Sequence, residues 1–202
     1  MGFLIRLVAC LLVAFLIAVY INQQESHQSS LYDEWILEAA RQWNVDPHLI
    51  KSVIWRESQF NPRKIGKARE RGLMQVTPIA GQEYATAIGL KRFREENLSD
   101  PRMGIMAGAW YLSRALARWE DRDNPVPFAL AEYNAGRSRA LRWAADQTGK
   151  KTGATEFLQA ISYPGTKAYV QSILERYEQY RAENDFGVAI PRARAATAPA
   201  AR

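Results

Sequence analysis

Residues 46–57 read Asp-Pro-His-Leu-Ile-Lys-Ser-Val-Ile-Trp-Arg-Glu, and this stretch indicates how the chain folds. Asp46 is a good helix N-cap, and proline is favoured at the first helical position. Apolar residues then recur at three- and four-residue spacing, which predicts a helix with one buried stripe. The stripe consists of Leu49, Ile50, Val53 and Ile54.

The same helical pattern continues on both sides of this stretch. Asp100 and Pro101 repeat the start signal before a long periodic segment, Gly136 suits a helix C-cap, and Thr166 is expected to cap the last helix. Strand signals are nearly absent. The predicted fold class is therefore mostly α, as a single helical domain with a groove between helices. The periodic apolar positions include Trp35, Ile36, Ala39, Ala40 and Trp43, then Ile105, Met106, Ala109, Trp110, Leu112 and Leu116, and finally Tyr169, Val170, Ile173, Leu174 and Tyr177.

The N-terminus has the charged-then-apolar order of an export signal, because Arg6 precedes an apolar run over residues 7–21. As a helix this run would span roughly 22 Å, which is shorter than the roughly 30 Å hydrocarbon core of a bilayer. Residues 1–21 are thus interpreted as a signal peptide or a membrane anchor. Because no small-x-small cleavage site follows the run, an uncleaved anchor is favoured.

The remaining boundaries follow from composition. Residues 22–30 are polar without an apolar period and are interpreted as a tether. Residues 31–186 carry the helical pattern and form the predicted domain, a length sufficient for a hydrophobic core. Residues 187–202 are rich in Ala, Pro and Arg, and we expect them to be disordered.

Charge and residue types exclude several classes of function. The net charge of the 202-residue chain is +6, but four of its arginines lie in the tail or before the apolar run, so the body carries only about +2. That is too little for a phosphate-tracking surface, and no nucleic acid is expected as a partner. The single cysteine, Cys10, allows no intramolecular disulfide. His27 and His48 belong to no visible metal constellation, and no phosphate loop is present, so neither a metal nor a cofactor is expected.

Glu57 is the most informative single residue. It stands seven residues after Ile50, which places its carboxylate on the buried stripe if the helix reaches that far. Partial desolvation and the negative pole of the helix C-terminus would both raise its pKa, as a general acid at neutral pH requires. On the spacing alone, another interpretation stays open, in which the helix ends by Arg56 and Glu57 is a solvated acid paired with Arg56 or Lys51.

Four short blocks in order resemble the soluble lytic transglycosylase family, whose members are related to goose-type lysozyme. The blocks are Glu57-Ser58-Gln59-Phe60-Asn61-Pro62, Gly72-Leu73-Met74-Gln75, Tyr133-Asn134-Ala135-Gly136, and Thr166 with Tyr169-Val170. Each block alone is weak, but together they extend over about residues 31–183. The resemblance implies a lysozyme-like helical domain with a saccharide groove.

The roles of the family's site residues are assigned to the positions of this sequence that match the family's motifs. The resemblance implies that Glu57 is the single catalytic residue, first acid and then base, in non-hydrolytic cleavage of the bond between N-acetylmuramic acid and N-acetylglucosamine, which leaves a 1,6-anhydro end. It assigns substrate contacts to Ser58, Met74, Gln75, Tyr133, Asn134 and Tyr169, with Tyr169 orienting the glutamate. From the residues alone, Met74, Tyr133 and Tyr169 are equally consistent with core positions, and Ser58 with a polar helix end.

Three positions depart from the family pattern. Arg69-Glu70 replaces a common Gly-Ala pair, which leaves the conformation of that loop and its charge open. Glu132 stands where a small or apolar residue is common, and it is a candidate for an extra groove carboxylate. Gly165 replaces a glutamate before the last block, so a supporting contact there is expected to be lost.

Two other functions remain open from the sequence. One is a hydrolytic muramidase that uses Glu57 with water as the nucleophile, helped by a second acid such as Glu132. The other is a non-catalytic module that binds the wall. In each case the expected partners are peptidoglycan glycan strands and, through the N-terminal segment, a membrane, with cell-envelope machinery as a further partner class. The expected location is the bacterial cell envelope, with the folded domain in the periplasm or otherwise outside the cytoplasmic membrane.

Overall fold

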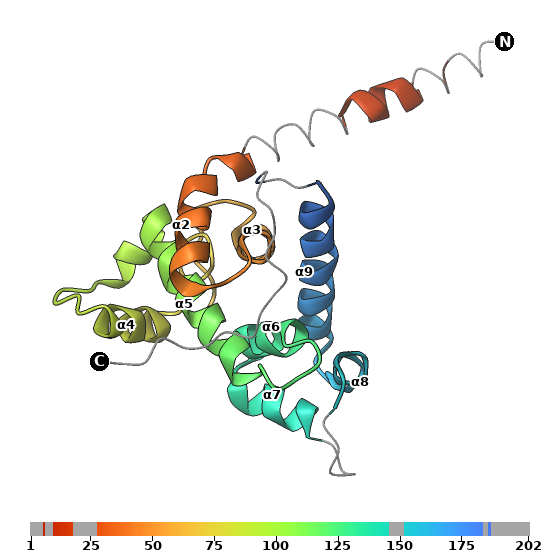
Figure 1. The fold of residues 1–202 in the computed structure, drawn as a ribbon. Helices are drawn as coiled ribbons and strands as arrows, with labels where there is room; N and C mark the ends of the chain where they lie inside the picture. The colour runs from red at the N-terminus through yellow and green to blue at the C-terminus, as the bar shows by residue number, and fades with distance from the viewer. Residues whose placement is uncertain (1–5, 7–9, 18–27, 146–151, 184–185, 187–202) are drawn as a thin grey trace. The chain divides into compact units, whose positions relative to one another are not determined.

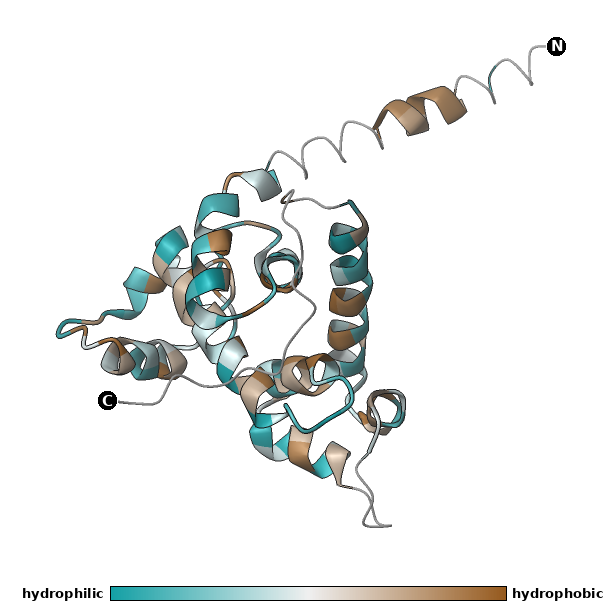
Figure 2. Ribbon diagram, in the orientation of Figure 1, coloured by the Kyte–Doolittle hydropathy of each residue, from teal (hydrophilic) through white to brown (hydrophobic). Residues whose placement is uncertain are grey.

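The computed structural model describes residues 6, 10–17, 28–145, 152–183 and 186 (Figure 1). The chain divides into two units, Met1–Glu34 and Trp35–Arg202. In the first unit, residues 10–17 are helical and almost uniformly apolar (Figure 2). No helix within the described residues is both long enough and apolar enough to cross a membrane. The predicted tail, residues 187–202, and most of the predicted tether lie outside the described residues.

The second unit is built from helices, and the prediction of a mostly α fold is confirmed. Its described residues form no strand beyond two isolated bridges, Ile65 with Arg71 and Arg71 with Val76. The helices in chain order are α2 (Asp33–Trp43), α3 (Pro47–Ser58), α4 (Pro78–Ala87), the 3-10 helix η1 (Glu95–Ser99), α5 (Pro101–Arg118), α6 (Val126–Ala135), α7 (Arg137–Ala144), α8 (Ala154–Ala160) and α9 (Pro164–Glu183).

Capping residues set the helix starts that the sequence predicted. The Asp46 carboxylate accepts a hydrogen bond from the backbone N–H of His48 at 2.8 Å, at the start of α3. Asp100 does the same for Met103 at 2.9 Å, at the start of α5. Each satisfies a donor that the first helical turn leaves unpaired, and proline follows each cap.

The predicted cap at Thr166 is wrong. Helix α9 begins two residues earlier at Pro164, whose fixed φ suits a first helical position. The buried Thr166 hydroxyl instead donates to the side chain of Asn134. By contrast, Gly136 does end α6 as predicted, with φ of +87° and its N–H donating to the carbonyl of Glu132.

The core lies where α3 packs against α9 and where α6 packs against α5, α7, α8 and α9. Ile50, Val53 and Ile54 of α3 are fully buried. Phe128 of α6 stacks on Phe157 of α8 with their ring centroids 4.0 Å apart, which fixes the short helix α8 to the centre of the domain. This packing brings the C-terminal ends of α3 and α6 to the N-terminal half of α9, where the groove described next is found.

Candidate active site

Glu57 lies in the last turn of α3, one residue before the helix ends at Ser58. Its side chain is half-buried and continues the buried stripe, as the spacing predicted. The structure does not place it in the surface ion pair that the spacing alone left open. Arg56 donates to the hydroxyl of Ser172 at 3.1 Å, and the fully buried Lys51 has its ammonium over an aromatic ring 4.8 Å away.

A tyrosine from α9 holds the Glu57 carboxyl group. The Tyr169 hydroxyl donates to Glu57 Oε1 at 2.7 Å. Burial raises the pKa of Glu57 to about 7, and the Tyr169 hydrogen bond and the charges of Lys64 and Arg56 oppose this rise only in part. Burial also raises the pKa of Tyr169 well above its usual value, so its hydroxyl stays a donor. Glu57 therefore exchanges a proton near neutral pH, which suits general acid and base chemistry.

The Glu57 carboxyl group faces a groove of about 770 Å³. The groove is formed by the end of α3, the following loop, the end of α6 and the first turns of α9. Glu57 is the only acidic side chain among the described residues that line it, and most of the others are cationic or uncharged polar groups. The lining residues are Arg56, Glu57, Lys64, Lys67, Gln75, Asn134, Tyr163, Gly165, Thr166 and Tyr169.

Gln75 reaches the groove from the loop between α3 and α4. Its side-chain amide donates to the carbonyls of Gly72, at 2.9 Å, and Lys64, at 3.0 Å, so the same group that lines the groove also holds the loop closed. Gly72 has φ of +77°, and a Cβ there would lie 2.0 Å from the carbonyl oxygen of Leu98. Only glycine allows this close approach.

The Arg69-Glu70 departure forms a defined turn at the outer side of this loop. The Glu70 carboxylate accepts from the backbone N–H of Ala68 at 2.9 Å, and Arg69 adopts φ of +66° with its guanidinium on Glu95. The charge of Glu70 contributes to the raised pKa of Glu57, although Glu70 does not line the groove. The substitution thus adds negative charge near Glu57 while the turn itself is well bonded.

Tyr133 and Asn134, at the end of α6, have different surroundings. The Tyr133 hydroxyl donates to the carbonyl of Met74 at 2.9 Å, which ties α6 to the loop. The exposed Asn134 lines the groove, and its Oδ1 accepts from Thr166 at 2.8 Å. This bond fixes the amide, and its N–H groups have no further hydrogen bond among the described residues.

Ser58 and Met74 do not present their side chains to the groove. The Ser58 hydroxyl is buried and donates to the carbonyl of Ile54, one turn back in its own helix. The Met74 side chain is fully buried in contact range of Gly108 in α5. Both occupy the structural positions that the residues alone allowed, and neither lies among the groove-lining residues.

The interpretation of Glu132 as an extra groove carboxylate is wrong. Its side chain is completely buried on the other side of α6, where it accepts from Arg118 Nε at 2.8 Å and from the Trp119 indole N–H at 2.7 Å. A charge at this depth is stable only because these donors satisfy it. Glu132 therefore cannot serve as a second acid in the groove.

The sequence interpretation gave no groove role to six of the lining residues, namely Arg56, Lys64, Lys67, Tyr163, Gly165 and Thr166. Lys64 donates its ammonium to the backbone carbonyl of Glu57 at 2.5 Å, a common role for lysine at a helix C-terminus. Lys67 and Tyr163 lie in loops, where no periodicity marks the side of the chain that faces the groove.

The described residues contain no cluster of three or more His, Cys, Asp or Glu side chains that could hold a metal ion. What the groove offers instead is one carboxyl group of raised pKa, amides, hydroxyls and cationic side chains. This combination is suited to proton transfer on a neutral, hydroxyl-rich ligand.

The comparisons with known proteins agree with this geometry. A family model described as the transglycosylase SLT domain matches residues 34–155. The chain is 32% identical over 118 residues to membrane-bound lytic murein transglycosylase F 1 of Alkalilimnicola ehrlichii, covering 57% of this chain and only 22% of that protein. It is 32% identical to the X polypeptide of Escherichia coli K12, covering 67% of this chain and 82% of that protein.

The fold is similar to a solved structure as well. An inactive glutamate variant of lytic transglycosylase Slt from Pseudomonas aeruginosa superposes with a TM-score of 0.67 at 23% identity. The match covers 74% of this chain and 24% of that one. The expected helical fold is thus confirmed as that of the solved lytic transglycosylase.

Proposed function

The chain belongs to the transglycosylase SLT family, and we propose that it cleaves the glycan strands of peptidoglycan with Glu57 as its one catalytic residue. The observation that carries the proposal is a single carboxyl group in the groove with a pKa raised to about 7 and a tyrosine hydroxyl bonded to it. Ordinary glycosidases need two carboxylates that flank the bond to be broken. A groove with one acid favours a mechanism in which the substrate supplies the second group.

In the first step, protonated Glu57 gives its proton to the glycosidic oxygen O4, which joins C1 of N-acetylmuramic acid to C4 of N-acetylglucosamine. The C1–O4 bond breaks, and the N-acetylglucosamine side leaves with a new hydroxyl. The positive charge that develops at C1 is stabilised by the N-acetyl group of the same muramic acid, which takes the place of a second protein carboxylate.

In the second step, ionised Glu57 removes the proton from the C6 hydroxyl of the same muramic acid. O6 bonds to C1, a 1,6-anhydro ring closes, and Glu57 is again protonated. No water is consumed. A carboxyl group whose pKa is near the working pH is suited to both roles, because neither protonation state is costly to reach.

The remaining groove residues would bind and orient the sugars. Gln75 and Asn134 offer amide groups that match hydroxyl and N-acetyl groups, and both are held in place by contacts within the protein. Tyr169 would hold the carboxyl group of Glu57 at a fixed angle to the bond being cleaved. These two kinds of contact supply the positioning on which a one-acid mechanism depends.

We further propose that the domain works in the bacterial cell envelope, outside the cytoplasmic membrane, where its substrate is found. One relative is named as membrane-bound, and this supports residues 1–21 as an anchor or export signal. The chain covers only 22% of that relative. A role beside cell-envelope machinery is a separate matter from the chemistry of the groove.

The test is mass spectrometry of the fragments released from purified sacculi by the full chain and by Glu57→Gln. We expect 1,6-anhydro muropeptides from the unchanged protein and none from the variant, because glutamine keeps the shape but does not donate a proton. Binding of both proteins to sacculi, measured by co-sedimentation, serves as the control for folding.

Other products would change the assignment. Reducing muramic acid ends would mean that water is the nucleophile, and the protein would be a hydrolytic muramidase. Binding to sacculi without release of any fragment would indicate a non-catalytic wall-binding module.

A further inference from the structure

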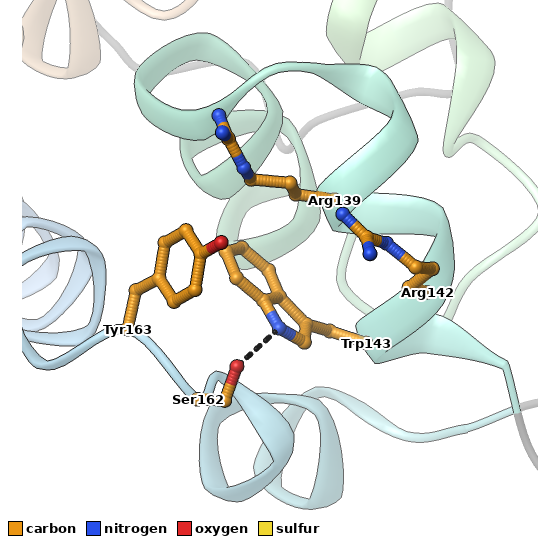
Figure 3. Close-up of a pocket in the computed structure, with 5 residues that line it drawn as sticks. All are labelled: Arg139, Arg142, Trp143, Ser162 and Tyr163. Atoms are coloured by element: carbon orange, nitrogen blue, oxygen red, sulfur yellow. Dashed lines mark hydrogen bonds between the residues drawn. The ribbon is translucent and has the colours of Figure 1, made fainter.

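A second, smaller pocket of about 240 Å³ opens between α7 and the segment that leads into α9 (Figure 3). Arg139, Arg142 and Trp143 line it from α7, and Ser162 and Tyr163 line it from the other side. The Trp143 indole N–H donates to the Ser162 hydroxyl at 3.0 Å, which joins the two walls. The Tyr163 ring packs edge-on against Trp143, with their centroids 5.4 Å apart.

The pocket is positively charged. Two of its five lining residues are arginines, and none of the described residues lining it is acidic. The Arg139 guanidinium lies 5.3 Å from the centre of the Tyr163 ring and donates to the carbonyl of Ala135. Arg142 is exposed, and no hydrogen bond or ion pair to another described residue engages it. A planar guanidinium with unused donors is well suited to a carboxylate.

This pocket adjoins the groove that holds Glu57. Tyr163 lines both, and it directly precedes Pro164, the first residue of α9. The 20-residue helix α9 directs its positive pole toward this region, which adds to the charge of the two arginines. A ligand that fills the groove can therefore extend a negatively charged branch into the pocket.

We propose that the pocket of Arg139, Arg142, Trp143 and Tyr163 binds a carboxylate of the peptide stem that branches from the glycan strand. This rests on the proposed function. The sugar backbone of such a strand is neutral, so the carboxylates of its peptides are the groups that two arginines can recognise. The aromatic rings supply apolar surface for the peptide beside the charge, and Arg142 provides a guanidinium that no other described residue binds.

The first test compares two substrates with the same sugars. Soluble glycan strands are prepared with their peptide stems, and a portion is treated with an amidase that removes the peptides. The lactyl carboxyl groups that the amidase exposes are then converted to amides, so that the naked strands carry no charge. Arg142→Ala in the full chain is expected to lower kcat/KM for the peptide-bearing strands about five- to tenfold, as for a charged hydrogen bond at an exposed site, and to leave the naked strands unchanged.

The matched control is Arg137→Ala, because Arg137 is an exposed arginine on the same helix but does not line the pocket. It removes the same charge and is expected to change neither rate. Equal loss on both substrates by Arg142→Ala, or equal effects of the two variants, would overturn the proposal.

Binding separates this proposal from the cleavage chemistry. With Glu57→Gln as the background, calorimetry measures the affinity for a disaccharide tetrapeptide, for the same compound with its carboxylates amidated, and for the bare disaccharide. The tetrapeptide should bind best, and Arg142→Ala should remove its advantage over the amidated form. If this order of affinities is observed while the unchanged protein cleaves nothing, the proposed function fails and the pocket assignment stands.

If the three ligands bind alike, the pocket assignment fails, whatever the activity. A third arm uses vesicles of anionic phospholipid. Loss of vesicle binding by Arg142→Ala, with no change for the tetrapeptide, would assign the pocket to lipid phosphates instead and overturn the proposal.

Discussion

Two glutamates of this protein are withdrawn from water, and they are held in opposite ways. Glu57, at the end of α3, faces the groove and receives a hydrogen bond from a neutral tyrosine hydroxyl. Glu132, near the end of α6, is completely buried and bound by the guanidinium of Arg118 and the indole of Trp119. Both carboxyl groups are shielded from water, Glu132 completely and Glu57 in part. They differ in the donor that holds them, which is a charged group at Glu132 and a neutral hydroxyl at Glu57.

A guanidinium brings a full positive charge, and its hydrogen bond with Glu132 fastens α5 to α6 within the core. A tyrosine hydroxyl brings only a dipole. Together with the charges of Lys64 and Arg56 it offsets only part of the cost of desolvating a charge at Glu57, so the pKa of Glu57 rises to about 7. Glu132 is therefore suited to hold the fold together, and Glu57 to give and take a proton.

The largest expected effect is on the rate of cleavage. Glu57→Gln should lower kcat by a factor of about 10³, within the range that a positioned acid and base contributes. Glu132→Gln keeps an acceptor for the Trp119 indole and lies outside the groove, so its kcat per folded molecule should change less than threefold by the same reasoning. Turnover of soluble strands, corrected for the folded fraction from circular dichroism, checks both. Comparable losses would remove the distinction between the two carboxyl groups.

The second effect is on stability, and here the larger change is expected at Glu132, not at Glu57. Glu132→Ala leaves the Arg118 charge and the Trp119 N–H without their acceptor, and it should lower the free energy of unfolding by about 3 kcal/mol. A chemical denaturation curve measures this. Arg102→Ala is the matched control, since it breaks the surface pair of Arg102 with Glu38 and should leave the unfolding midpoint nearly unchanged. Equal shifts would mean that Glu132 behaves as a surface charge.

The third effect concerns stability at alkaline pH, where substitutions of the two glutamates should change the free energy of unfolding in opposite directions. The pKa of Glu57 is higher in the folded protein than its ordinary 4.5, so the folded state holds this proton more tightly than the unfolded state. Its contribution to stability is therefore fully present below pH 4.5 and is lost as the pH rises to about 7. Allowing for the partial exposure of Glu57, we expect Glu57→Gln to be more stable than the unchanged protein by about 2 kcal/mol at pH 8 and by little at pH 4.

Denaturation of both proteins at the two pH values measures this difference, and the titration of all other groups cancels in the comparison. Glu132→Gln should lower the free energy of unfolding at both pH values. If Glu57→Gln were also destabilising at pH 8, burial would not be the main cause of the raised pKa.

The sequence predicted the parts of this arrangement that depend on local spacing. The Asp-Pro starts of α3 and α5, the glycine at the end of α6 and the place of Glu57 on the buried stripe all follow from neighbours within one or two turns. The resemblance to a family then placed Tyr169 beside Glu57, although 112 positions separate them in the chain.

Other positions could not be assigned in this way, because they depend on which face of a helix meets which neighbour. Glu132 and Tyr133 are adjacent, but Glu132 faces Arg118 whereas Tyr133 reaches the loop at Met74. Nothing in a mostly apolar helix such as α6 marks one face as the core. The contribution of Lys64 likewise comes from the path of a loop, which has no periodicity to interpret.

The smallest expected effect concerns the hydrogen bond between Tyr169 and Glu57. Because this bond stabilises the ionised carboxylate, it lowers the pKa of Glu57, and Tyr169→Phe should raise that pKa above 7. The first step needs protonated Glu57, so kcat/KM of the unchanged protein should fall as the pH rises through about 7, and this alkaline limb should move to higher pH in the variant. The loss of orientation should also lower kcat at pH 6 about fivefold.

Tyr177→Phe is the control on the same helix, because the Tyr177 hydroxyl donates to Asp46 at 2.8 Å and lies outside the groove. This variant should lower the free energy of unfolding but leave the alkaline limb of kcat/KM where it is. A limb that stays fixed in Tyr169→Phe would mean that a group other than Glu57 supplies the proton.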